Sequence, residues 1–78
     1  MLVTFNYSKL RGRIREIYQT ESNFAKSLGI SSVSLSGKLN NKVGFSSTEI
    51  MKSLKLLDID VEEVGLYFFD TTLKKTKV

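Results

Sequence analysis

The chain has 78 residues, enough for one domain with a single small hydrophobic core. It contains no cysteine and no histidine, which excludes disulfide frameworks, zinc fingers and catalysis by either side chain. The formal charge of +4 is unevenly spread: residues 1–57 hold nine Lys/Arg and three Asp/Glu, residues 58–70 hold five acidic residues, and residues 71–78 hold three lysines. A basic body favours a polyanionic partner, and an ordinary solvated surface is the plainer alternative.

The first element expected in chain order is a helix over residues 8–18. Leu10 and Ile14 begin an apolar stripe at helical spacing, and either Asn6 or Ser8 can cap its start. We therefore expect this helix to turn its apolar stripe toward the core.

Two short helices follow, over residues 21–28 and from residue 32 to 39 or 40. Thr20 is a suitable N-cap for the first helix and Ser31 for the second, and Gly29 stands where a left-handed residue ends a helix. The turn between them is too short for two antiparallel helices, so we expect a steep crossing and hence a helix-turn-helix.

The second half of the chain predicts two further helices. Ser46 and Glu49 form a capping box at the start of one, after a turn in which Gly44 permits a positive φ. Asp60 with Glu63 resembles a second capping box and opens the last helix. Its inward residues are expected to be Val61, Val64 and Phe68.

Both ends of the chain have the composition of extended segments. Residues 2–5 and 71–78 contain β-branched residues with partial alternation, so they can pair with each other or with another subunit. The alternative is that both termini are frayed, including the C-terminal tail at residues 70–78. The chain as a whole predicts one all-α domain of five helices, with a core at about residues 7–69.

The third helix carries the candidate site. Leu35 and Leu39 lie four residues apart and anchor one face, which leaves short side chains on the other. In a helix-turn-helix the start of the second helix enters the DNA major groove. The residues predicted to face the bases are Ser32, Val33, Ser34 and Gly37, of which serine can donate or accept and valine can touch a thymine methyl. The plainer alternative is an ordinary surface, with Gly37 allowing a close helix contact.

Phosphates are expected to contact the polar groups around that helix. Helix N-terminal amides near Thr20 can bind one phosphate, and the residues after the helix can bind others. These expected phosphate contacts are Thr20, Lys38, Asn40, Asn41 and Lys42.

Four stretches resemble a known family: "YSKLRGRIRE", "FAKSLGIS", "SLSGKLNNK" and "DVEEVGLYFF". The sequence resembles helix-turn-helix regulators of the phage Cro/repressor superfamily, in particular the short Cro-like proteins of Gram-positive temperate phages and prophages, over about residues 7–69. The resemblance implies a lambda-repressor-like fold, places Ser31 on the cap of the recognition helix as a further phosphate contact, and puts Asn40, Asn41 and Lys42 on the phosphate-contacting loop.

The function that the resemblance implies is repression of a promoter in a lysis/lysogeny switch by binding operator DNA. We expect a homodimer, at least on DNA. Its interface can be built from Tyr67, Phe68, Phe69 and the tail; the alternative is that these aromatic residues complete the core, which we favour for Phe68. We expect no cofactor, metal, small-molecule ligand or membrane association, and a location in the bacterial host cytoplasm at the nucleoid. Catalysis is not expected, because no base, nucleophile or metal set surrounds the acidic residues. The rival is a protein-interaction module or antitoxin on the same fold.

Overall fold

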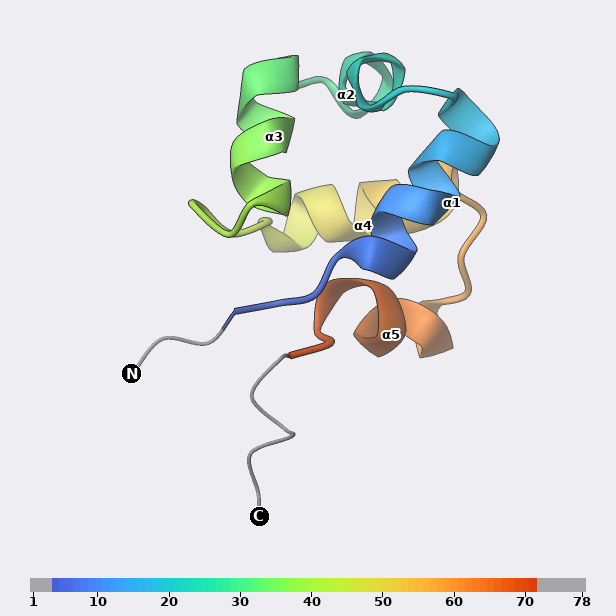
Figure 1. The fold of residues 1–78 in the computed structure, drawn as a ribbon. Coiled ribbons are helices and arrows are strands. Elements are labelled where there is room, and N and C mark those ends of the chain that lie inside the picture. Colours follow the sequence, from blue (N-terminus) through green and yellow to red (C-terminus); the bar gives the residue numbers. More distant parts are fainter. Residues whose placement is uncertain (1–3, 72–78) are drawn as a thin grey trace.

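The computed structural model describes residues 4–71 and is built from helices (Figure 1). These are α1 (Ser8–Tyr18), α2 (Glu21–Leu28), α3 (Ser32–Leu39), α4 (Ser47–Leu56), the 3-10 turn η1 (Val61–Glu63) and α5 (Val64–Phe68). The all-α prediction with five helices is confirmed, and the bounds of the first three helices agree with the sequence pattern.

Side-chain caps start α2 and α4 where the sequence places them, but not α1. The N-cap position of α1 is Tyr7 rather than Asn6 or Ser8, and it makes no side-chain capping bond; Asn6, one residue earlier, accepts a hydrogen bond from the Ser8 amide at 2.9 Å. Thr20 accepts from the Asn23 amide at 3.1 Å at the start of α2. The capping box at α4 is complete, because Ser46 and Glu49 each accept from the other's backbone amide. Polar side chains thus satisfy amides that the helices leave unpaired.

The capping box expected at Asp60 is absent, and the prediction there is wrong. The Asp60 side chain makes no capping hydrogen bond. The chain instead begins with the 3-10 turn, in which the Glu63 amide donates to the Asp60 carbonyl at 2.8 Å. That amide is therefore already paired with backbone, and Val61, expected to face inward, is 59% exposed.

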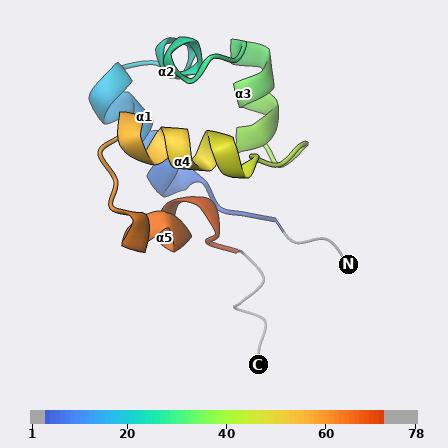
Figure 2. The ribbon, with the colours of Figure 1, turned by 180° about the vertical axis from the view of Figure 1, so that it is seen from behind.

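A single core fills the space between the helices. Its largest fully buried hydrophobic residues come from α1, α2, α3, the end of α4 and α5: Leu10, Ile14, Phe24, Leu35, Leu57 and Phe68. Figures 1 and 2 show α2 and α3 together at one end of the molecule and α5 at the other, with α1 and α4 between them. The burial of Phe68 agrees with its expected place in the core.

The two ends of the described chain lie side by side near α5. Phe5 and Thr71 form an isolated antiparallel bridge, and the Asn6 amide donates to the Asp70 carbonyl at 2.6 Å. The expected pairing of the two ends is confirmed at this position, while the rest of the expected strands, residues 2–3 and 72–78, lies outside the described residues. Within residues 4–71, no helix has both the length and the hydropathy needed to cross a bilayer.

Candidate functional site

The junction of α2 and α3 is a tight turn. Gly29 has φ of +89°, and its amide and that of Ile30 both donate to the Ala25 carbonyl, at 2.9 and 3.0 Å. Such a left-handed residue closes a helix and turns the chain sharply. Figure 1 looks along α2 and across α3, so the two helices cross steeply, as the short turn predicts.

Buried leucines determine which face of α3 points outward. Leu35 is fully buried and Leu39 is 3% exposed, and both belong to the same core as Phe24 and Ala25 of α2. Because residues four apart share one side of a helix, the opposite side of α3 is left to solvent. Val33 on that side is 80% exposed.

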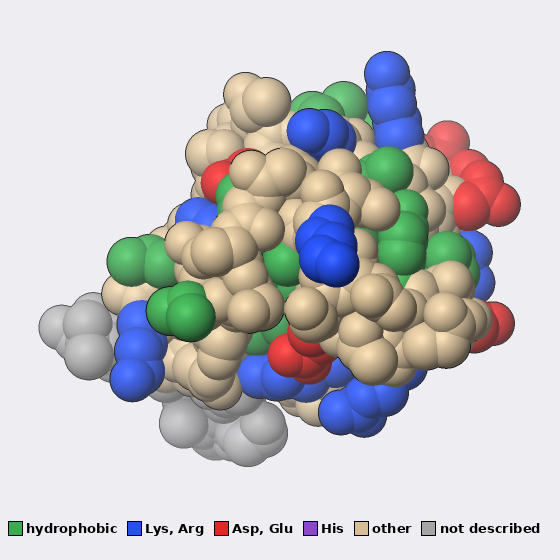
Figure 3. Space-filling view, turned by 90° about the horizontal axis from the view of Figure 1, so that it is seen from above, with side chains coloured by type: hydrophobic (Ala, Val, Ile, Leu, Met, Phe, Trp, Pro, Cys, Tyr) green, Lys and Arg blue, Asp and Glu red, His purple; other side chains and the backbone are tan. Residues whose placement is uncertain are grey.

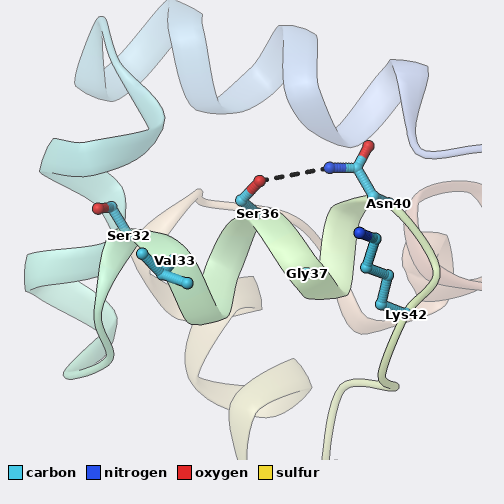
Figure 4. A pocket seen from close by; sticks show the side chains of 6 residues that line it. All are labelled: Ser32, Val33, Ser36, Gly37, Asn40 and Lys42. Atoms are coloured by element: carbon cyan, nitrogen blue, oxygen red, sulfur yellow. Dashed lines mark hydrogen bonds between the residues drawn. The ribbon is translucent and has the colours of Figure 1, made fainter.

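The outer face of α3 forms a shallow open hollow, which we call the α3 hollow. It is lined by Ser32, Val33, Ser36, Gly37, Asn40 and Lys42 (Figure 4). The structure thus brings together three of the four residues predicted to face bases with two of those predicted to face phosphates.

Sequence reasoning missed Ser36 and included Ser34. The missed signal is spacing: residues 32, 36 and 40 fall four apart and therefore on one side of α3. Ser34 does not line the hollow; its amide donates to the Ser31 Oγ at 3.0 Å, and the two hydroxyls are 3.1 Å apart. Ser31 is thus the N-cap of α3, as the resemblance implies.

Asn40 is tied to the body of the protein through Arg11. The Arg11 guanidinium donates to the Asn40 Oδ1 at 3.1 Å and to the Leu39 carbonyl at 3.2 Å, and it forms an ion pair with Glu21 at 2.8 Å. Asn40 in turn donates to the Ser36 Oγ at 3.3 Å. Arg11 therefore links the start of α2 to the end of α3, and fixes how α3 is presented.

Lys38 points into the protein rather than to solvent. Its Nζ donates to the Gly44 carbonyl and pairs with the Glu49 carboxylate, each at 3.1 Å, and only 13% of its side chain is exposed. Hydrogen bonding from the Ser46 amide lowers the pKa of the Glu49 carboxyl, and Lys38 lowers it further. The Lys38 cation is thus already compensated by an internal carboxylate.

Asn41 likewise has internal partners, through two hydrogen bonds to the backbone of Phe5. It also holds the left-handed position of this turn, with φ of +63°, where the sequence pointed to Gly44. Among the predicted phosphate contacts after α3, Lys42 remains as an exposed cation with no internal partner within residues 4–71.

The charges on this end of the molecule are scattered. Seen from above α2 and α3, uncharged groups cover most of the surface, and Lys and Arg side chains stand apart from one another with acidic groups among them, so they form no continuous basic patch in this view (Figure 3). Hydroxyl, amide and isopropyl groups on a helix suit hydrogen bonding and apolar contact with a partner surface. Within residues 4–71, no cluster of three or more acidic side chains could hold a metal ion.

Comparison with known proteins adds two findings. A family described as "Protein of unknown function (DUF739)" matches residues 3–71. Among solved structures, the chain is similar to the modulator of repression (MOR) of the temperate bacteriophage TP901-1 from Lactococcus lactis, a solution structure. The identity is 38% and the TM-score 0.75, over 83% of this chain and 88% of that one. No curated protein matches significantly. The expected kinship with regulators of temperate phages agrees with this, while the narrower Cro type stays a prediction.

Proposed function

The chain belongs to the DUF739 family. Because it is also similar to a modulator of repression from a temperate phage, we propose that it is a regulator in the lysis/lysogeny decision of such a phage and that it binds operator DNA through α3. One observation supports the proposal most strongly. The outer face of α3 is exposed and carries mostly short side chains, and the buried side chains of its inner face hold the helix in place. A helix of this kind can lie in the major groove with its backbone close to the base edges.

The residues have distinct roles in this proposal. Ser32, Val33 and Ser36 face base edges, and Gly37 lets the backbone approach. The N-terminal amides of α2 near Thr20, together with Lys42, meet phosphates on either side of α3. A homodimer would double this small contact and match a two-fold operator. The chain needs no cofactor and performs no catalysis in this role.

A second candidate function is supported by the same surface. Lys38 and Asn41 are engaged internally, so the face offers fewer free groups for phosphates than its sequence indicates. The similar phage protein is titled a modulator of repression, and a modulator can act on a repressor protein instead of on DNA. In this alternative, the α3 hollow and the exposed Val33 contact a protein.

Salt dependence distinguishes the two functions. We measure the affinity for the DNA flanking the coding region by fluorescence anisotropy. We expect the logarithm of the association constant to fall linearly with the logarithm of the salt concentration. Lys42→Ala should weaken binding to all duplexes alike and reduce that slope by about one ion. Lys55→Ala on the exposed face of α4 is the matched control. Absence of duplex binding at low salt would reject DNA binding and leave the protein-interaction function.

A further inference from the structure

We propose that Val33 reads the C5-methyl group of a thymine in the major groove, and that this contact is the main direct source of base specificity. The inference rests on the proposed DNA-binding function and goes one step further. It names the base that α3 selects and the residue that selects it.

The first argument is the exposure of Val33. At 80% it is the most exposed large hydrophobic side chain within residues 4–71, although it lies on a well-packed helix. Its isopropyl group is rigid, because a β-branched side chain in a helix is nearly confined to one rotamer. A fixed, exposed apolar group suits a fixed apolar partner. In the major groove, the thymine methyl is the apolar group that a base pair presents.

The second argument is the surroundings of Val33 in the α3 hollow (Figure 4). Gly37, one turn along, has no side chain and leaves the helix backbone bare. A Cβ placed there would meet Val43 Cγ2 at 3.8 Å. Val33, the Cα of Gly37 and the half-exposed Val43 therefore offer apolar groups beside the polar Ser32 and Ser36 on the outer face of α3. At Gly37 itself, no side chain stands between the helix backbone and a base edge.

The third argument is that few other side chains in the α3 hollow can recognise one specific base. The strong base contacts of proteins are bidentate bonds from Arg or Lys to guanine and from Asn or Gln to adenine. Arg11 is engaged with Glu21, the Leu39 carbonyl and Asn40, and Asn40 bonds both Arg11 and Ser36. Lys42, the remaining cation of the hollow, is assigned to a phosphate in the proposed function. The hydroxyls of Ser32 and Ser36 can donate or accept, and so discriminate weakly among bases. Within this hollow, Val33 is the group whose chemistry matches one base.

The experiment compares thymine with deoxyuridine, which pairs identically but lacks the methyl group. The full chain first selects binding sites from a randomised duplex library made with unmethylated cytosine, so that thymine is the one source of a C5-methyl. Each thymine of a selected site is then replaced by deoxyuridine, and the affinity is measured by anisotropy. We expect a loss of about three- to five-fold at one thymine per half-site.

Two variants test the residue. Val33→Ala should remove the difference between thymine and deoxyuridine at that position. Val33→Thr, which keeps the shape but replaces a methyl by a hydroxyl, should reduce it. The salt slope should stay unchanged in both. Selective binding without any methyl dependence, or a dependence that persists in Val33→Ala, would overturn this inference alone. Failure to bind any duplex would instead overturn the proposed function, and the inference with it.

Discussion

The side-chain amide of Asn41 pairs with the backbone of Phe5 as a neighbouring strand would. Asn41 Oδ1 accepts from the Phe5 amide and Asn41 Nδ2 donates to the Phe5 carbonyl, both at 2.9 Å. Phe5 also bridges to Thr71. The loop after α3 is therefore attached to both ends of the described chain, and the candidate site is coupled to the termini.

Asn41→Gly tests this coupling. Glycine accepts the positive φ without strain, so the variant removes the two side-chain hydrogen bonds and keeps the backbone. We expect a loss of about 1 kcal/mol in the free energy of unfolding, because such bonds are exposed and contribute modestly. Amide exchange of Phe5 should accelerate, as measured by NMR. An unchanged exchange rate at Phe5 would show that the contact is not persistent in solution.

Replacing Gly37 or Gly29 by alanine should change the free energy of unfolding in opposite directions. Gly37 lacks a positive φ and has room for a Cβ, so Gly37→Ala should stabilise the protein by about 1 kcal/mol through helix propensity. Gly29→Ala should destabilise it by about 1–2 kcal/mol, because φ of +89° strains an L-residue. Chemical denaturation measures both. Equal effects of the two changes would contradict the turn geometry.

Leu35 and Val33 lie on opposite sides of α3 and should respond differently to truncation. Leu35→Ala removes a fully buried side chain and should cost about 2–5 kcal/mol in unfolding free energy. Val33→Ala should change stability by no more than about 0.5 kcal/mol, since Val33 is 80% exposed. Thermal unfolding checks both. A large loss in Val33→Ala would mean that this face is not free.

Glu49 should make stability depend on pH in the acid range. Its pKa is lowered in the folded state, first by the hydrogen bond from the Ser46 amide. A lowered folded pKa contributes stability that is present above the unfolded pKa and is lost as the pH falls through the folded one. Glu49→Gln keeps a capping acceptor but does not ionise, so its melting temperature should fall less steeply with acid. Identical acid profiles would contradict the role of this carboxylate.

Local chemistry explains how much of the fold was predictable. Caps at Thr20, Ser31 and Ser46 are read from short stretches of sequence, and the helix bounds follow from them. The start of the last helix was not predictable in this way. There, a backbone bond between the Asp60 carbonyl and the Glu63 amide replaces the side-chain cap.

The candidate site was predictable only in part, because its polar residues are used by distant segments. Lys38 pairs with Glu49 of α4, and Asn41 with Phe5, contacts that no local pattern reveals. Ser36 was accessible in principle from its spacing of four to Asn40. What a side chain is free to bind thus depends on tertiary partners, whereas the face it lies on depends on helical period.

The central claim, that the outer face of α3 binds operator DNA, is tested most directly by a charge placed in the α3 hollow. Ser36→Glu adds one negative charge there, and Val61→Glu adds the same charge at the exposed start of η1, toward the α5 end of the molecule. In an anisotropy titration with a selected duplex, we expect Ser36→Glu to weaken binding at least about ten-fold, because the carboxylate would face phosphates and base acceptors. Val61→Glu should stay within about two-fold of the parent chain. Undiminished affinity of a folded Ser36→Glu protein would contradict the account.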